Sequence, residues 1–586
     1  MSGPVEWHDG RIVEAPTWFG PEERPLFGWF AYPEDSAVRG AVVICHAVGE
    51  EARSSRRTMR DLSRRLAEDG LLVLRFDYDG TGDSGGDFND PSWQDRWAAS
   101  VDEAVRFVQT TGVTSLSLVG MRMGATIAAV AASGSGWSAD SIVLWDPCRS
   151  GRDFLREQSM LHRAMNDNAR ATSDEGVVTP GYVFGEPAAK AFGALRVEDA
   201  LAIDAARTRV TVAFRDDRPA PAALAAKFES AGFSIIEVSG QAELLGVSPL
   251  DAQVPEAAME TVAGILSDAA GPERREVRVP LRSRASLTTP WGSVTETFTA
   301  VGPDRLFGIS TRPNELVSDI ETVFLNVANE GHIGPARMWS ELARQWSAQA
   351  GVSALRFDLS GLGDSPDTDG QPRDTTYLPT RIDDIDEAVT DVNARGHKAV
   401  LVGLCSSAYA ALEGSLRKPV AGAIVINPIL DSIEMTMTNR DPVAGDPRRK
   451  AYRRWPDPLV RLVVKHRRIA HTLRRAGQQL RPSQAAMGVI SDVLRRKVVV
   501  FLALGADDRH PFDVNWYWNL RELSLQRKGR FERVNIPELD HSGLVEEGRV
   551  RLKDAMTRHV DKHYSVWTGA AREIIPADAS SITGTP

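Results

Sequence analysis

The chain has 586 residues, of which 42% are hydrophobic and 25% are charged, a balance typical of globular proteins with two or more domains. Its net charge of −10 argues against a general nucleic-acid-binding protein. Three cysteines are too few for a disulfide framework, no apolar run reaches the ~18 residues that span a bilayer, and charged residues interrupt the segment after Met1, so we expect a cytoplasmic protein without a transmembrane helix.

The chain contains one pattern twice, about 280 residues apart. The sequence Leu-Arg-Phe-Asp at 74–77 returns at 355–358. Each copy is followed by a Gly-x-Gly-Asp-Ser turn, at 80–84 and at 361–365. Because a similar spacing is kept by several elements, the pattern indicates a tandem duplication.

Apolar runs alternate with amphipathic patterns in each copy, which predicts a doubly wound, mostly parallel sheet with helices on both faces. In the second copy we expect strands at 322–325, 353–357, 399–402, 423–426, 498–504 and 533–536, and helices at 336–350, 382–394 and 408–416. We place the first domain at residues 1–271, the second at 272–568 and a disordered tail at 569–586.

The segment after the strand at 399–402 has the form of a nucleophile elbow. It reads Gly-Leu-Cys-Ser-Ser at 403–407 and leads into the helix at 408–416. Such a turn crowds the positions two before and two after the nucleophile, which are therefore small. Gly403 and Ser407 satisfy that condition, and Cys405 takes the place of the nucleophile.

Both halves resemble α/β-hydrolases, over roughly residues 20–268 and 300–565, and most closely the serine aminopeptidase-like (S33) and exosortase-associated hydrolases. The resemblance is carried by CHAVGEEARSSRR and LRFDYDGTGDS in the first half, and by LRFDLSGLGDS and VGLCSSA in the second. It implies two tandem α/β-hydrolase domains, each with a lid insertion. It also implies a triad in the chain order nucleophile, acid, histidine.

An acid and a histidine follow Cys405 in that order. Asp508 ends a Gly-x-x-Asp turn after the strand at 498–504, with Asp507 as the fallback, and His541 follows the last predicted strand. His510 competes with His541, but it follows the acid turn instead. We therefore expect a Cys405–His541–Asp508 triad, in which the imidazole takes the thiol proton and the carboxylate orients the imidazole.

The resemblance also implies an oxyanion hole made of backbone N–H groups. One donor is the residue after the nucleophile, Ser406, and the other comes from the loop at 327–330, from Ala328 or Asn329.

The first copy lacks this chemistry. Its elbow, Gly-Met-Arg-Met-Gly at 120–124, holds Arg122 in the nucleophile position, and arginine cannot be deprotonated to attack a carbonyl. Asp217 takes the acid position, but 240–244 contains no histidine. We expect a non-catalytic half that completes a pseudo-dimer; a second interpretation is that Arg122 binds a carboxylate or phosphate.

The lid of the second half, about 430–497, is strongly basic between 448 and 481. Helical spacing gathers Arg461, Lys465 and Arg468 on one face, and a cationic lid attracts anionic substrates. We favour coenzyme A or a phosphopantetheine-bearing carrier protein as the acyl donor. An anionic glycan, contact with a membrane surface and a merely solvated face remain alternatives.

The reaction that these residues favour is acyl transfer or thioester hydrolysis through an acyl-Cys405 intermediate, since a thioester reacts readily with amines and thiols. An ester or lactone hydrolase is the close alternative, and a non-catalytic binding or scaffold protein is the alternative from another class. The sequence shows no metal-ligand spacing and no Gly-rich phosphate loop, so we expect no metal and no cofactor.

Overall fold

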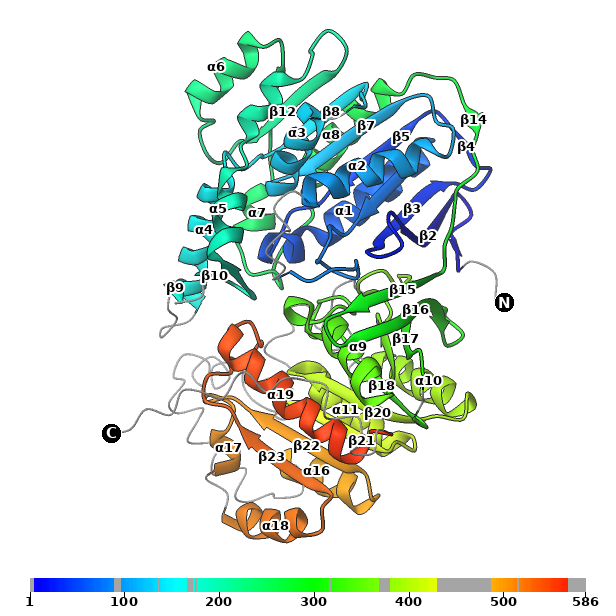
Figure 1. Cartoon of the computed structure of the whole chain (residues 1–586), viewed down its shortest axis with the longest axis vertical. Helices are drawn as coiled ribbons and strands as arrows, with labels where there is room; N and C mark the ends of the chain where they lie inside the picture. Colours follow the sequence, from blue (N-terminus) through cyan, green and yellow to red (C-terminus); the bar gives the residue numbers. More distant parts are fainter. Residues whose placement is uncertain are drawn as a thin grey trace, which may run out of the picture.

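The computed structural model describes residues 5–88, 96–134, 136–165, 172–173, 176–315, 318–367, 380–428, 486–513 and 516–566. In it the two halves of the sequence form two bodies stacked along the longest axis of the molecule, blue to green above and green to red below (Figure 1). Within these described ranges, no helix is long and apolar enough to cross a bilayer.

The first half is built on a nine-stranded sheet in the order β1-β2-β3-β6-β5-β7-β8-β12-β13. The strands from β6 to β13 pair in parallel, whereas the pairings of β1, β2 and β3 are antiparallel. The strands are β1 (Trp7–His8), β2 (Ile12–Phe19), β3 (Leu26–Pro33), β5 (Ala41–Cys45), β6 (Leu72–Phe76), β7 (Leu116–Met121), β8 (Ser141–Trp145), β12 (Arg209–Arg215) and β13 (Ser234–Val238).

Helices cover both faces of this sheet because its central strands are apolar on both sides. Val42 and Ile44 of β5 pack in one cluster with α1 and α8, whereas Val43 packs in another with α2 and α3, as the period of two along a strand requires. The helices are α1 (Glu50–Glu68), α2 (Arg96–Gln109), α3 (Met123–Gly134), α6 (Ala222–Ser230), α7 (Gln241–Leu245) and α8 (Glu256–Ala269).

An insertion between β8 and β12 forms the lid of the first half. It comprises α4 (Gly151–Met165), a small sheet of β9 (Thr172–Ser173), β10 (Gly176–Thr179) and β11 (Tyr182–Gly185), α5 (Glu186–Ala194) and the 3-10 helix η2 (Val197–Ala202).

The second half repeats the same topology. Its nine-stranded sheet has the order β15-β16-β17-β19-β18-β20-β21-β22-β23, again with an antiparallel start and parallel pairing from β19 onward. The strands are β15 (Arg284–Thr289), β16 (Gly292–Val301), β17 (Leu306–Pro313), β18 (Ile320–Phe324), β19 (Ser353–Phe357), β20 (Lys398–Leu404), β21 (Gly422–Ile426), β22 (Val499–Leu504) and β23 (Phe531–Asn535).

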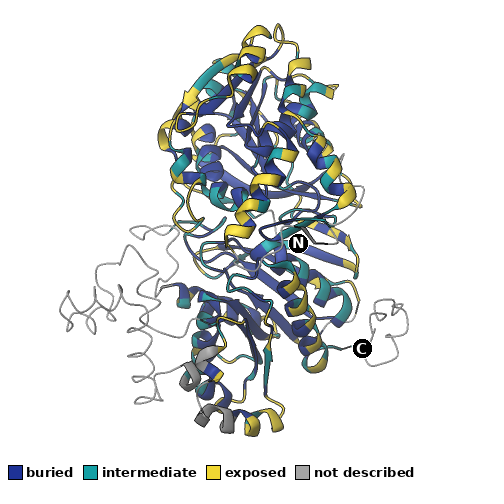
Figure 2. Ribbon diagram, turned by 90° about the vertical axis from the view of Figure 1, so that its left-hand side faces the viewer, coloured by how far each residue is buried: buried dark blue, intermediate teal, exposed yellow. Residues whose placement is uncertain are grey.

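The helices of the second half also lie in two layers, and Figure 2 shows the strands between them mostly in the dark blue of buried residues. They are η3 (Pro335–Arg337), α9 (Met338–Ala350), α10 (Thr380–Ala394), α11 (Ser406–Arg417), α16 (Ala486–Arg495), α17 (His510–Asp513), α18 (Trp516–Arg527) and α19 (Glu546–His563). The predicted fold class, two doubly wound and mostly parallel sheets, is confirmed.

The sequence did not predict the antiparallel strands β15 to β17. Polar residues interrupt their apolar positions, as in Gly-Ser-Val-Thr-Glu-Thr of β16. Between the halves, the short strand β14 (Arg275–Glu276) still pairs with β4 (Ala37–Val38) of the first half, and β15 begins eight residues after β14 ends.

The two halves meet at the junction, which we define as the contact of β2 and β3 with β15 to β17 and of the surrounding loops. One aromatic cluster contains residues of both halves. Trp18 stacks on Phe298 with 5.6 Å between ring centroids, and Phe27 stacks on Phe307 at 6.3 Å. Each pair joins equivalent positions of the two copies, so the junction has pseudo-twofold symmetry.

The repeated sequence motifs supply the ionic part of the junction. Arg356 of the second Leu-Arg-Phe-Asp motif binds Asp83 of the first Gly-x-Gly-Asp-Ser turn. Reciprocally, Arg75 of the first motif lies 2.7 Å from Asp364 of the second turn. Because each motif contacts the other half, the contact is of the isologous kind found in symmetric dimers.

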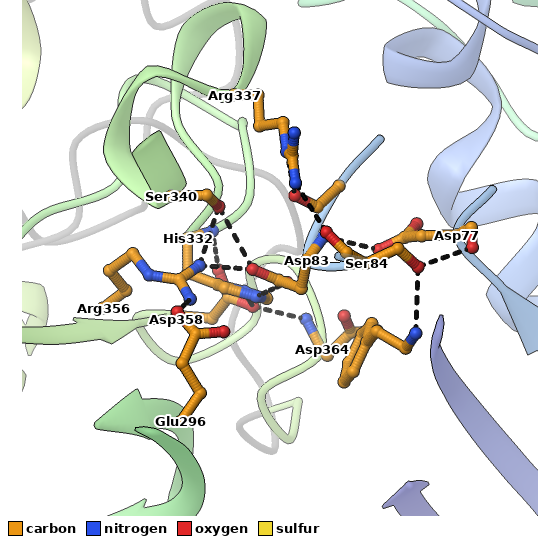
Figure 3. Close-up of polar contacts among 12 residues, drawn as sticks. Asp77, Asp83, Ser84, Glu296, His332, Arg337, Ser340, Arg356, Asp358 and Asp364 are labelled. Atoms are coloured by element: carbon orange, nitrogen blue, oxygen red, sulfur yellow. Dashed lines mark hydrogen bonds and ion pairs between the residues drawn. The ribbon is translucent and has the colours of Figure 1, made fainter. Parts of the chain in front are cut away.

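His332 sits at the centre of this network, as Figure 3 shows. Its Nε2 lies 2.6 Å from Asp83 of the first half, and its Nδ1 lies 2.8 Å from Asp358 of the second. Burial by itself lowers the pKa of His332, but Asp358 and Asp83 outweigh it and raise that pKa to about 10. His332 is therefore a cation that bridges two carboxylates across the junction.

Candidate active site

Cys405 lies at the sharp turn between β20 and α11, with φ of 58° and ψ of −113°. Residues other than glycine rarely adopt a positive φ, and such strain is typical of a nucleophile elbow. A Cβ added at Gly403 would lie 2.3 Å from the carbonyl oxygen of Ser407. The close approach of strand and helix therefore explains the small residue at position 403.

The structure brings the three predicted triad residues together from three loops. His541 follows β23, and its Nε2 lies 3.0 Å from Sγ of Cys405. Its Nδ1 lies 2.8 Å from Oδ1 of Asp508, in the turn after β22. Asp507, the fallback acid, is exposed, and the competing His510 is the first residue of α17.

The surroundings of His541 favour its protonated form. Burial by itself lowers the pKa of His541, but its hydrogen bonds to Asp508 and Cys405, together with their charges, raise that pKa to about 11. An imidazolium beside a cysteine stabilises the thiolate, which is the nucleophilic form. The arrangement can thus activate Cys405 as a nucleophile.

The loop after β18 packs against the elbow, as the predicted oxyanion hole requires. Ala328 has a φ of 54°, and its N–H donates to Oγ of Ser406 at 3.1 Å. Ser406 is the first residue of α11, where backbone N–H groups have no partner inside the helix. The side chain of Asn329 turns to the first half, where its Nδ2 donates to the carbonyl of Pro249 at 3.0 Å. The role of these three residues as oxyanion donors stays a prediction.

Sequence reasoning missed Asn427, which follows β21 and joins the acid loop to the histidine loop. Its Oδ1 accepts from the N–H of Gly505 at 2.7 Å. Its Nδ2 donates to the carbonyls of Asp540 and His541 at 3.0 and 3.2 Å. Asn427 is buried with a φ of 44°, and the Asn-Pro pair at 427–428 was a turn signal that could have pointed to it.

Residues 323–554 match the model of the alpha/beta hydrolase family, and residues 36–167 match that of serine aminopeptidase, S33. The chain has a tandem α/β-hydrolase fold. The predicted resemblance is thereby confirmed at the level of fold, while the cysteine nucleophile is not tested by these matches. No curated protein sequence matches the chain.

Three solved structures similar to this tandem hydrolase each cover less than half of it. The ferulic acid complex of Est1E from Butyrivibrio proteoclasticus is 18% identical, with 43% of this chain and 96% of that chain covered and a TM-score of 0.34. The esterase PF2001 of Pyrococcus furiosus is 17% identical, with 44% and 91% covered and a TM-score of 0.33. An esterase of the fungus Rhizomucor miehei is 13% identical, with 44% and 84% covered and a TM-score of 0.32.

The first hydrolase domain keeps the elbow turn, but carboxylates of the chain neutralise the charge of Arg122 in the nucleophile position. Arg122 has a φ of 55°, and its guanidinium lies 2.9 Å from Glu51, 2.9 Å from Glu157 and 3.5 Å from Asp146. Asp217, in the acid position, pairs with Arg215 at 2.5 Å. Three carboxylates of the chain itself therefore occupy Arg122, which weighs against its binding an external anion.

The first half contributes a cation to the surroundings of the second half's elbow. Arg53 of α1 lies 2.8 Å from Glu330 and 3.1 Å from Glu50. Burial by itself lowers the pKa of Arg53, but these carboxylates, with a smaller contribution from Cys405, raise that pKa. Nothing in the second half's sequence could have revealed a partner some 350 positions away in the chain.

The predicted substrate-binding residues of the lid, Arg461, Lys465 and Arg468, lie outside the described residues, as does the tail from 569. Within the described part of the chain, two clusters have the residue types of a metal site: His332 with Asp358 and Asp364, and Glu532 with His559 and His563. Both ring nitrogens of His332 are already bonded to carboxylates. In the second cluster, Nδ1 of His559 is bonded to Glu532 at 2.9 Å.

Proposed function

We propose that the second half catalyses acyl transfer or acyl hydrolysis through an acyl-cysteine intermediate. The observation that carries this proposal is the unbroken line from Asp508 through His541 to Sγ of Cys405, with spacings of 2.8 and 3.0 Å. A nucleophile, a base and an orienting acid in contact are the geometry of nucleophilic catalysis. A scaffold protein has no use for that alignment on a strained elbow.

In the first half-reaction, Sγ of Cys405 attacks the carbonyl carbon of an ester or thioester, and its proton resides on Nε2 of His541. The carbonyl oxygen becomes an oxyanion, and the N–H groups of Ser406 and Ala328 are its proposed donors. Each such donor stabilises the transition state by about 2.7–4 kcal/mol. Ala328 must then exchange its bond to Oγ of Ser406 for one to the oxyanion.

Collapse of this intermediate breaks the bond to the leaving alcohol or thiol, which takes the proton from His541. The acyl group remains on Cys405 as a thioester. An acceptor hydroxyl, amine, thiol or water then attacks, loses its proton to His541 and releases the acylated product and the Cys405 thiol. Throughout both steps Asp508 holds Nδ1–H of His541 and stabilises the imidazolium.

The intermediate can be tested by intact mass spectrometry. We expect incubation with acetyl coenzyme A or 4-nitrophenyl acetate to add one acetyl group, which peptide mapping places on Cys405. Cys405→Ala should abolish both the adduct and turnover, while Cys148→Ala, a change at a buried cysteine of the first half, should keep both. Turnover by Cys405→Ala, or an adduct on another residue, would refute the mechanism.

Ester or lactone hydrolysis is the second candidate, favoured by the matches to hydrolase family models. The two candidates differ in the acceptor that takes the acyl group from Cys405. Adding hydroxylamine or a thiol to the 4-nitrophenyl acetate reaction should divert acyl groups from water if the enzyme is a transferase. An unchanged yield of free acid would assign it as a hydrolase. An anionic donor such as coenzyme A remains part of the transferase proposal.

A further inference from the structure

Between the two halves lies a cavity of about 150 Å³, here called the junction cavity. A cavity of similar size in another protein accepts benzene. The first half contributes residues of β3, α1, β6, the loops after β5 and β6, and parts of its lid; the second contributes residues of the loop 329–337, Asp364 and Leu544. Its apolar wall includes Phe27, Trp29, Tyr78, Phe88, Trp97 and Phe184.

The junction cavity adjoins the Cys405 site. Asn329 and Glu330, which line it, belong to the loop that packs against the elbow. Leu544, also in its wall, follows His541 by three residues. Arg53 lines the cavity and interacts electrostatically with Cys405. The cavity and the Cys405 site therefore share the loop that packs against the elbow and the segment that follows His541.

Arg56 of α1 is a cation in this wall that lacks a bonded partner. The other arginines on its side of α1 are engaged: Arg60 donates to the carbonyl of Gly363 at 2.9 Å, and Arg64 pairs with Glu14. Arg56, by contrast, makes no hydrogen bond or ion pair within the part of the chain that the structure describes.

Nearby carboxylates favour the charged form of Arg56, although they form no hydrogen bond or ion pair with it in the described part of the chain. Burial by itself lowers the pKa of Arg56, and the carboxylates, Asp364 first and Asp358 second, raise it. Both are engaged by other groups, Asp364 in an ion pair with Arg75 and Asp358 in a hydrogen bond with His332. The guanidinium instead lies against Gly331, where an added Cβ would be 2.6 Å from Nη1.

Two further polar atoms in the cavity wall are buried with neither a hydrogen-bond partner nor an ion-pair partner among the described residues. They are the donor Nε of Arg53 and the acceptor Oδ1 of Asn329. Buried polar groups are nearly always bonded, so unbonded ones that line a cavity point to a missing polar ligand. Arg53 and Arg56 both line the cavity, and guanidinium N–H groups suit an oxyanion, which accepts several N–H bonds at once.

We propose that the junction cavity binds an anionic group of the substrate, a carboxylate or a phosphate carried on a small apolar or aromatic body, with Arg56 as the recognising residue. The non-catalytic half thus forms the specificity pocket of the catalytic half. That the bound molecule is the substrate rests on the acyl-transfer function proposed above, whereas the binding itself does not.

Binding can be measured without turnover, because Trp29 and Trp97 line the cavity and report occupancy by fluorescence. The probes are benzoate, hydrogen succinate and phenyl phosphate, with neutral benzamide as the isostere of benzoate. We expect saturable binding of at least one anion to the Cys405→Ala protein. Arg56→Met should weaken that binding about 10- to 100-fold, since it removes charge-assisted hydrogen bonds. Benzoate against phenyl phosphate separates a carboxylate site from a phosphate site.

Arg57→Met is the matched control, since Arg57 neighbours Arg56 on α1 but pairs with Asp61 at 3.4 Å and should leave anion binding unchanged. Arg56→Lys keeps the charge and should bind anions with intermediate strength, and it serves where Arg56→Met does not fold. The proposal is overturned if no anion binds saturably to the protein. It is also overturned if neither Arg56 variant weakens binding, or if benzamide binds as tightly as benzoate.

The link between anion binding and catalysis is tested separately, by measuring KM for an anionic and a neutral ester. If Cys405 forms acyl adducts, Arg56→Lys should raise KM for 4-nitrophenyl hydrogen succinate about 10-fold and leave KM for 4-nitrophenyl butyrate unchanged. Equal effects on both esters, with anion binding intact, would mean that the cavity binds something other than the acyl substrate. Absence of any adduct would instead refute the proposed function while leaving the binding result standing.

Discussion

Replacing His332 by glutamine should remove a pH-dependent stabilisation of the junction. Buried His332 keeps its proton up to a pKa of about 10, against 6.5 for an ordinary histidine. At about 1.4 kcal/mol per pKa unit, the shift corresponds to about 5 kcal/mol. Because the folded-state pKa is raised, this contribution is fully present below about pH 6.5 and is lost as the pH rises towards 10.

The assay is urea unfolding of the wild type and His332→Gln, followed by tryptophan fluorescence at about pH 6.5, 8 and 9.5. The stability difference between the two proteins should shrink by several kcal/mol across this series, on the scale of the linkage estimate of about 5 kcal/mol. His8→Gln is the control, since His8 is half exposed at the surface and should change stability by less than about 0.5 kcal/mol. A difference that stays constant from about pH 6.5 to 9.5 would show that His332 is not a bridging cation.

Three further predictions concern Asn427, the elbow of the first half and the lid of the second half. Asn427→Ala should lower kcat about 10- to 100-fold by loosening the acid and histidine loops, whereas the control Asn393→Ala, at a partly exposed position of α10, should not; equal kcat values would deny Asn427 a positioning role. Arg122→Met leaves buried carboxylates unpaired and should cost about 3–5 kcal/mol in urea unfolding with kcat of the folded protein unchanged; a hundredfold loss of kcat would make Arg122 part of a functional site. Changing Arg461, Lys465 and Arg468 together to Glu should raise KM for acetyl coenzyme A, but not for a neutral 4-nitrophenyl ester. Equal changes for both substrates would mean that these charges are only a solvated face.

The sequence could predict that the three triad residues lie close together, because the motifs around them and their order along the chain determine their positions in the fold. Each of Cys405, Asp508 and His541 follows an apolar strand, and the carboxyl ends of parallel strands meet at one edge of a sheet. The tandem repeat likewise allowed the fold of the first half, which is less regular, to be predicted from that of the second half. Strand periodicity did not reveal β15 to β17, because polar residues interrupt their apolar positions, as in β16.

Contacts between the halves could not be predicted, because they join residues about 300 positions apart and leave no period in the sequence. The Gly-x-Gly-Asp-Ser turn is visible as a repeat, yet only the fold shows that Asp83 and Asp364 bind arginines of the opposite half. For the same reason nothing in the sequence indicated that Arg53 interacts with Cys405 or that Arg56 lines a cavity between the halves. Sequence reasoning therefore located the candidate nucleophile but not the residues around it.

The pseudo-twofold junction joins two halves of one chain, and this affects how a substitution acts in the molecule. In a dimer of identical chains, every substitution appears twice, and dilution separates the subunits. Here the covalent link keeps the effective concentration of the partner high at any dilution, and a substitution alters one side alone. The first half can therefore hold Arg122 in its elbow while the second half holds Cys405. The same asymmetry lets His332 bridge Asp83 and Asp358, while Arg56 stands near the equivalent Asp364 and Asp77 without bonding to them.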